Sequence, residues 1–309
     1  MGWKIFLSFV FFLIVIFLLV FYWLFPLNSF EFGMKNRNSN FSIGALSGDM
    51  QFYSNMRYPA QKISYKIYGC PLQKKDDVKR AFDTLSNKTI LYFYPIYNDE
   101  EISVRCDSKT RIESSVFIAG EGGPTNITKT DKFSVIHNGE ILLIKESQCE
   151  NPNIAIHEIL HALGFKHSNN PDNIMYNFSR CSQTIGDDMI SIINKIYSYP
   201  SYADINLEDV SAVMHGLYLD INLTAMNEGL NNSGNAKIKI YADDKMIKEL
   251  DLTPIGIGYG RVISLYNIFI KKLSVDELKI VAETDFSELD KTNNEVLLQI
   301  QKNKKEKEA

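Results

Sequence analysis

The sequence predicts an α+β domain with a twisted sheet and long helices, preceded by a transmembrane helix and followed by an all-β sandwich. Three observations predict this order: an uncharged run near the N-terminus, mixed helical and strand-like patterns through residues 59–200, and short alternating segments after residue 205. With 309 residues, of which 45% are hydrophobic, the chain is long enough for two cores. Its net charge of −4 lacks the basic excess that binds phosphate backbones, so we expect no nucleic-acid partner.

Residues 1–28 are expected to form a membrane anchor. From Ile5 to Phe25 the chain has 21 residues without a charge, and as a helix this run spans roughly 30 Å, the thickness of a bilayer core. A cleaved signal peptide is the alternative, but its apolar core has roughly 7–15 residues and ends at a small-x-small site. Only Leu27 and Ser29 have the spacing of such a site, so we favour an uncleaved transmembrane helix.

The residues after the anchor are expected outside the cytoplasm. The flanking charges, Lys4 on one side and Lys35 and Arg37 on the other, leave the positive-inside rule close to neutral. Four cysteines favour two disulfides in an exported segment, with three connectivities open, over four free thiols in a reducing compartment. Asn-x-Ser/Thr triplets agree with export without proving it: Asn40, Asn87, Asn126, Asn177 and Asn222. We predict a single-pass protein with a cytoplasmic N-terminus and its remaining domains at the cell surface.

The α+β domain is predicted over residues 59–200, after a polar, Gly- and Ser-rich stalk over residues 29–58. Apolar residues at helical spacing predict a helix over residues 74–85. Strands are expected at residues 63–69, 89–97 and 114–120. We expect the Gly-rich residues 120–126 to be a loop and Asn138-Gly139 to turn a hairpin.

The stretch HEILHALGFKH, residues 157–167, contains three of the five histidines in the chain. A helix that starts near Asn151 and Pro152 places His157 and His161 one turn apart on the same face, where both imidazoles reach one ion. Gly164 can end that helix in a left-handed conformation, which lets His167 approach as a third ligand from another direction. Chance recurrence of structural histidines is the alternative, and it leaves the joint spacing unexplained.

Three protein ligands leave a fourth position open, which is typical of a catalytic zinc site, whereas structural zinc sites have four protein ligands. Glu158 lies beside the predicted ion and is our candidate general base. Zinc lowers the pKa of its bound water to roughly 7, and a carboxylate beside it can accept the proton as the water attacks a carbonyl. We therefore expect one catalytic Zn²⁺ held by His157, His161 and His167.

The motif resembles that of the metzincin zinc endopeptidases, H-E-x-x-H-x-x-G-x-x-H, which is complete at His157, Glu158, His161, Gly164 and His167. Ser168, Pro171 and the pair Met175-Tyr176, which stands where the matrixin branch has its Met-turn, are similar to that branch. The resemblance implies that Met175 forms a hydrophobic floor beneath the ligands and that residues 182–198 form the closing helix. No residues match the second zinc site or the calcium loop of animal matrixins, and Cys70 lacks the cysteine-switch motif of their propeptides.

The cysteines are expected to pair around this site. Cys149 precedes the metal helix and Cys181 follows the Met-turn, so a bond between them ties the helix to the floor beneath the metal. That pairing is a hypothesis, and it leaves Cys70 with Cys106.

Residues 205–302 are predicted to form an immunoglobulin-like sandwich, because five or more short alternating segments are separated by turn clusters. The segments 223–234, 239–252 and 285–300 resemble the cell-adhesion-related (CARDB-like) sandwich domains of prokaryotic surface proteins. Acidic residues in these segments are expected to be solvated turns, and cation binding is the less favoured alternative. Residues 303–309 are expected to be a charged tail.

Together these features predict a membrane-anchored zinc endopeptidase that cleaves proteins or peptides outside the cytoplasm. Substrates are expected to bind in an extended conformation along an edge strand, for which residues 115–120 are the candidate. The sandwich is expected to position the enzyme near a substrate or an envelope partner. The alternatives are a surface adhesion protein with a structural or relic metal site, against which Glu158 argues, and hydrolysis of a non-peptide amide, which the motif leaves open.

Overall fold

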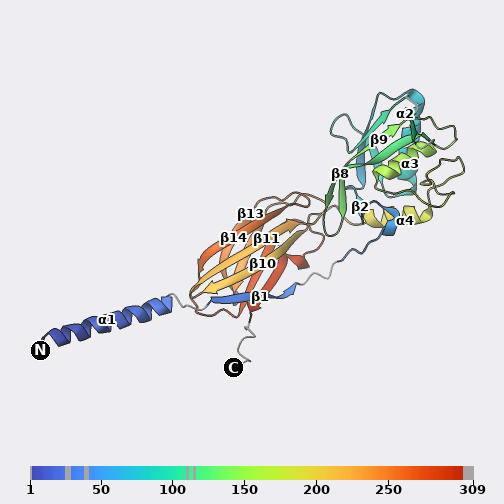
Figure 1. Cartoon of the computed structure of the whole chain (residues 1–309). Coiled ribbons are helices and arrows are strands. Elements are labelled where there is room, and N and C mark those ends of the chain that lie inside the picture. The colour runs from blue at the N-terminus through green and yellow to red at the C-terminus, as the bar shows by residue number, and fades with distance from the viewer. Residues whose placement is uncertain (1, 25–28, 38–41, 109–110, 114–115, 302–309) are drawn as a thin grey trace. The chain divides into compact units, whose positions relative to one another are not determined.

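A computed structural model describes residues 2–24, 29–37, 42–108, 111–113 and 116–301 (Figure 1). The chain divides into two compact units that are not continuous in sequence. One contains residues 42–203 and 228–231, and the other contains residues 1–41, 204–227 and 232–309. We call them the α+β unit and the sandwich unit.

The sheet of the α+β unit is mostly parallel, in the order β2-β9-β5-β3-β4, and β8 pairs antiparallel with β9. Its strands are β2 (Met56–Arg57), β3 (Lys62–Tyr68), β4 (Tyr92–Pro95), β5 (Ile102–Cys106), β8 (Gly120–Lys129) and β9 (Ser134–Leu143), with a separate pair β6 (Arg111–Glu113) and β7 (Val116–Ile118). The helices are the short η1 (Gly48–Met50), α2 (Leu72–Lys88), α3 (Asn153–Ala162) and α4 (Asp187–Tyr197). Among the described strands, β8 is therefore an edge strand that pairs with the sheet through β9 only.

Helix α2 includes the predicted residues 74–85 and buries the face that the sequence indicates, with Val78, Phe82 and Leu85 almost fully covered. The Phe82 ring stacks on Tyr65 of β3 with centroids 4.2 Å apart. Burying side chains of this size stabilises the fold by about 1.5–3 kcal/mol each. Because α2 and α3 also contact each other, this core fixes the position of the histidine-bearing helix (Figure 1).

Two expectations for this unit are wrong. Residues 120–126 are not a loop but the first part of β8, and Asn138-Gly139 is not a hairpin turn but part of the continuous strand β9. A two-residue hairpin of this kind needs positive φ angles at Asn and Gly, and neither residue has one. Gly139 is required for another reason, because a Cβ there would lie 2.5 Å from the hydroxyl of Tyr58.

The predicted stalk over residues 29–58 is also wrong. Residues 29–37 form β1 (Ser29–Arg37) of the sandwich unit, where Phe32 is 5% exposed in the core. Later stalk residues belong to the α+β unit: the buried Arg57 guanidinium donates hydrogen bonds to the carbonyls of Ile196 and Tyr199, at 2.7 and 2.9 Å. The polar composition of this stretch gives no sign of these contacts, because Ile196 and Tyr199 lie far away in the sequence.

The sandwich unit has one continuous eight-stranded sheet in the order β13-β12-β15-β16-β1-β10-β11-β14. Its further elements are β10 (Ile205–His215), β11 (Tyr218–Asn227), β12 (Ala236–Ala242), β13 (Lys245–Leu252), β14 (Gly260–Phe269), β15 (Glu277–Thr284), the short η2 (Thr292–Asn294) and β16 (Glu295–Ile300). β1 pairs with β16 on one side and with β10 on the other, and so joins the two halves of the sheet. Figure 1 shows β1 along the sandwich unit near β10. The inward residues of both halves form one hydrophobic core. The all-β prediction is confirmed, with β1 as an additional strand. Lys302 and the predicted tail over residues 303–309 lie outside the described residues.

Helix α1 (Gly2–Leu24) contains the uncharged run. Over Trp3–Phe21 its mean hydropathy is 3.0, and none of this segment is buried. By length and composition it can cross a membrane, and a signal sequence has the same properties.

Candidate metal centre

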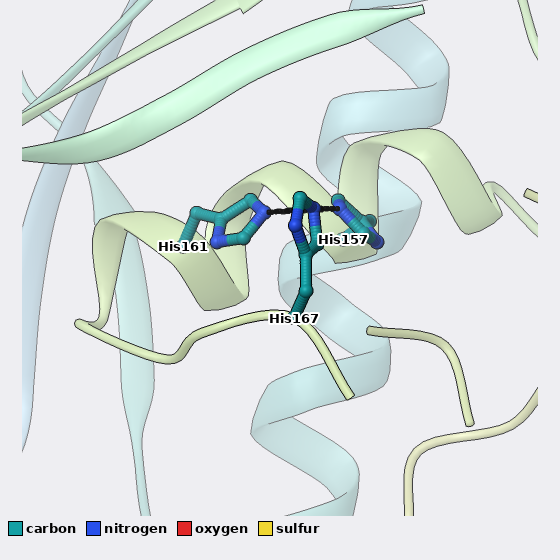
Figure 2. A group of neighbouring side chains, drawn as sticks. All are labelled: His157, His161 and His167. Carbon is teal, nitrogen blue, oxygen red and sulfur yellow. Dashed lines mark hydrogen bonds between the residues drawn. The ribbon is translucent and has the colours of Figure 1, made fainter. Parts of the chain in front are cut away.

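The three histidines of the sequence motif converge on one point. His157 and His161 project from α3 and His167 from the segment after it, and their Nε2 atoms face one another (Figure 2). The three Nε2–Nε2 distances are 3.0, 3.1 and 3.2 Å. Nitrogens at about 2.0–2.1 Å from one tetrahedral zinc lie about 3.3–3.4 Å apart, so this triangle has nearly the size that zinc requires.

The hydrogen bonds of the outer ring nitrogens fix which nitrogen carries a proton. Nδ1 of His157 lies 2.6 Å from the carbonyl oxygen of Ile174, and Nδ1 of His161 lies 2.7 Å from that of Phe165. A carbonyl oxygen only accepts, so both Nδ1 atoms must donate, which leaves both Nε2 atoms with lone pairs. Two lone pairs 3.0 Å apart repel each other unless a cation lies between them.

The histidines are also held in the form that binds metals. Burial, reinforced by the neighbouring histidines, lowers the pKa of His161 to about 4. Burial is also the main cause that lowers the pKa of His157 and of His167. Neutral imidazoles are the metal-binding form, and within the described part of the chain this is the one group of three or more His, Cys, Asp or Glu side chains that can hold an ion.

Glu158 follows the first ligand and lies almost fully buried, with 4% of its surface exposed. Among the described residues, its Oε2 has no hydrogen-bond partner. Burial, and secondarily the charge of Glu121, raise the pKa of Glu158 to about 8. A buried carboxylate without a partner is costly in a purely structural role, whereas a bound cation and a water molecule beside it supply what it lacks.

The glycines of β8 make room for this carboxylate. A Cβ on Gly120 would lie 2.8 Å from Oε1 of Glu158, and one on Gly122 would lie 2.3 Å from its backbone oxygen. At Gly123, by contrast, a Cβ would meet nothing within 4 Å. Glycines at these two positions therefore let the edge strand pass directly over α3.

The third ligand is positioned by residues that the sequence reading assigned to the stalk. Gly164 turns the chain with a φ of 92°, and the residues after it pair with the segment around η1. The Phe52 amide donates to the Gly164 carbonyl at 2.9 Å, and the buried Gln51 side chain exchanges two hydrogen bonds with the backbone of Met56, at 2.8 and 2.9 Å. The local sequence held no signal for these contacts.

The Met-turn contacts the histidine-bearing segments through its backbone carbonyls. Met175 is fully buried in the core of the α+β unit, and its carbonyl accepts the Ser168 amide at 2.8 Å, next to His167. The preceding residue, Ile174, accepts the hydrogen bond from His157. Residues 174 and 175 thus help to position His157 directly and His167 through the neighbouring Ser168.

A cleft of about 1180 Å³ contains the histidines and Glu158. Its walls include Gly120–Gly122 of β8, residues 145–149 and residues 176–181. A disulfide between Cys149 and Cys181 joins the last two walls, and a second disulfide joins Cys70 to Cys106. These are the pairs that the sequence analysis expected. The predicted edge at residues 115–120 agrees with the structure only at its end: Ala119 and Gly120 line the cleft and Gly120 begins the edge strand β8, whereas Val116–Ile118 form β7, which pairs with β6. Ser115 lies outside the described residues.

Comparison with known families agrees with this geometry. Residues 57–198 match the family model described as Matrixin, and residues 205–297 match the one described as CARDB. The chain contains a matrixin domain. Matrixin domains are zinc-dependent, and the histidine triad that holds such an ion is present in this one. The matrixin domain is followed by a CARDB domain, which confirms the second resemblance.

Relatives of the matrixin domain include human matrix metalloproteinase-16, 27% identical over 184 residues, which cover 50% of this chain and 28% of that protein. Rat macrophage metalloelastase is 28% identical over 139 residues, which cover 39% of this chain and 28% of the relative. The chain therefore spans little more than a quarter of the length of either relative. Among solved structures, the CARDB domain of a Pyrococcus furiosus protein is 11% identical, with a TM-score of 0.25, and the match covers 32% of this chain and 88% of that one.

Proposed function

We propose that the protein is a zinc-dependent endopeptidase that is anchored in a membrane and acts outside the cytoplasm. The observation that carries the activity is the convergence of three imidazole lone pairs beside Glu158, a buried carboxylate with an unpartnered oxygen. A structural zinc site has four protein ligands and needs no general base next to an open position. Glu158 therefore favours catalysis over the alternative of an adhesion protein with a structural or relic metal site.

The substrate is a peptide in an extended conformation that adds to the edge of β8. Gly120–Gly122 line the cleft, and the side of β8 that faces away from β9 offers backbone donors and acceptors to an incoming strand. Pairing of this kind binds the peptide backbone and holds its scissile bond over Glu158 and the histidines. It selects for extended chains, and the side-chain preference depends on the other walls of the cleft.

Glu158 moves the proton in the reaction. His157, His161 and His167 would hold the zinc ion, which would supply Lewis-acid chemistry by acidifying a water molecule and polarising the scissile carbonyl. The Glu158 carboxylate accepts the proton of the water as its oxygen adds to the carbonyl carbon. The protonated Glu158 then donates this proton to the leaving amine, which breaks the C–N bond and restores the carboxylate. The hydrogen bonds from Nδ1 to the Ile174 and Phe165 carbonyls keep the rings in the orientation that binds metal.

Two features support the location. Both disulfides are formed, and disulfides persist outside reducing compartments. Helix α1 is long and apolar enough to remain as the anchor, with the N-terminus in the cytoplasm. The CARDB domain, whose strand β1 follows the anchor and whose other strands follow the matrixin domain in the chain, is then the part that can contact an envelope partner.

The full-length protein, purified in detergent, tests the activity with a library of unmodified peptides. Glu158→Gln is expected to bind zinc as the wild type does but to cleave about 10²- to 10⁴-fold more slowly, because only the proton transfer is lost. Glu150→Gln, which changes an exposed carboxylate outside the cleft, is the matched control and keeps full activity. If wild type and Glu158→Gln cleave equally, or if zinc-loaded wild type cleaves nothing, the endopeptidase assignment fails.

A further inference from the structure

The strand register of the sandwich unit shows which residues lie at the same end of the sheet as Ser29, the first residue of β1. Ser29 pairs with His215 at the end of β10, and Tyr218 at the start of β11 pairs with Phe269 at the end of β14. The turn between β10 and β11 and the loop after β14 therefore lie at the Ser29 end of the sheet. β1 runs from this end to Arg37, and β10 begins at the other end with Ile205. The chain connections after β1 and before β10, which lead to and from the matrixin domain, thus leave from the end opposite Ser29.

Only four residues, 25–28, separate α1 from β1. Five steps of extended chain reach at most about 17 Å, and the headgroup layer itself is about 5–7 Å thick. If α1 crosses a membrane, Ser29 is confined to a thin layer next to the lipid. Phe269 lies three strands from β1, which is about 14 Å along the sheet at about 4.8 Å per strand. The whole Ser29 end is therefore within reach of the lipid surface.

Three exposed side chains at this end are apolar, beside charged groups that include the Lys272–Asp243 ion pair. Phe30 is 41% exposed, Phe269 is 54% exposed and Leu273 is 46% exposed. The loop that carries Leu273 has buried residues on both sides, Ile270 and Val275, and the Ile270 amide donates to the Leu217 carbonyl at 2.8 Å. The fold thus holds the loop in place while its apolar tip points away from the core.

A lysine accompanies the apolar side chains. Lys271 is exposed and lies between Phe269 and Leu273 in the sequence. Apolar side chains that enter the headgroup layer, with a lysine amine left at the phosphates, are the usual combination at a membrane interface. We name Phe30, Phe269, Lys271 and Leu273 the juxtamembrane end.

We propose that the juxtamembrane end of the CARDB domain rests on the lipid surface, with Phe269 and Leu273 in the headgroup layer. The domain is then attached to the membrane at two points, α1 and the juxtamembrane end. Two attachments restrict the tilt of the domain, whereas attachment through α1 alone leaves the tilt free. The connections to the matrixin domain then leave from the end of the sheet that faces away from the lipid. The inference rests on the proposed anchoring through α1.

Fluorescence quenching in vesicles tests both steps separately. The two tryptophans of the chain, Trp3 and Trp23, both lie in α1, so quenching of tryptophan by lipids that carry a nitroxide in the acyl chain reports insertion of α1. An environment-sensitive fluorophore on Leu273→Cys of the full-length protein reports the loop, with Tyr259→Cys as the control. Tyr259 is 71% exposed and lies at the opposite end of β14.

In vesicles of phosphatidylcholine and phosphatidylglycerol with headgroup nitroxides, the label at 273 is expected to be quenched several-fold more strongly than the label at 259. Quenched tryptophans with equal quenching at 273 and 259 overturn the juxtamembrane contact and leave the anchor intact. Unquenched tryptophans overturn the anchor and the contact together.

The unmodified full-length protein gives a second readout that does not depend on new cysteines. A soluble reagent that acylates lysines is added to the protein in the same vesicles. We expect it to modify Lys271 several-fold more slowly than Lys291, which is also exposed and lies at the opposite end of the sheet. Equal rates for the two lysines, measured by mass spectrometry, contradict the proposal.

Discussion

Adding one methyl group at Gly122 is expected to lower both the stability and the activity of the site. A Cβ at this position would lie 2.3 Å from the backbone oxygen of Glu158, whereas ordinary contacts of a Cβ begin near 3.4 Å. In Gly122→Ala, β8 and α3 must therefore separate by about 1 Å. Overpacking of this size destabilises a core by about 1–3 kcal/mol, and a displacement of about 1 Å at a reacting group can lower the rate about 10²-fold.

Gly123→Ala is the matched control, because a Cβ on Gly123 meets no atom within 4 Å. We expect Gly122→Ala to unfold at lower urea concentration than wild type and to cleave a fluorogenic peptide about 10²-fold more slowly at saturating zinc. The Gly123→Ala protein should keep both properties. If Gly122→Ala matches Gly123→Ala in stability and activity, β8 does not lie over Glu158 as described.

Three further predictions concern the same unit. In metal-free wild type, the pKa of Glu158 is raised from 4.5 to about 8, so its contribution to the free energy of unfolding is complete below pH 4.5 and is lost as pH rises through 8. In urea unfolding across this pH range, the free energy of unfolding of Glu158→Gln should rise relative to wild type by up to about 5 kcal/mol. Parallel pH profiles of the two proteins would contradict this prediction. Replacing Cys149 and Cys181 together by Ser opens a loop of sequence separation 32 and should lower the free energy of unfolding by about 4 kcal/mol, with an unchanged midpoint as the contrary result. Gln51→Ala leaves the Met56 backbone groups unpaired and should cost about 1–3 kcal/mol and weaken zinc binding in a chelator competition, whereas unchanged zinc affinity would show that this segment does not position His167.

The sequence alone predicted the features whose cause is local. Two histidines at positions i and i+4 must share a helix face, and Gly164 after them takes the left-handed conformation that non-glycine residues avoid. The apolar spacing in residues 74–85 predicted α2 in the same way. In each case the chain within one or two turns determines the structure.

The features that sequence reading missed depend on distant partners. β1 pairs with β10 and β16, which begin more than 160 residues after it ends, so its pairing left no local signal. The glycines of residues 120–123 suggested a loop because glycine weakens an isolated strand. In the structure their missing side chains are what allow β8 to lie against α3.

The central claim is that His157, His161 and His167 hold one zinc ion and leave a position open beside Glu158. Zinc K-edge X-ray absorption on the full-length protein, combined with metal quantification, measures this directly. The account predicts one zinc per chain with three imidazole nitrogens and one oxygen, at about 2.0–2.1 Å, and loss of that zinc in His161→Ala. A zinc with four protein ligands, or zinc binding that His161→Ala leaves unchanged, would contradict it.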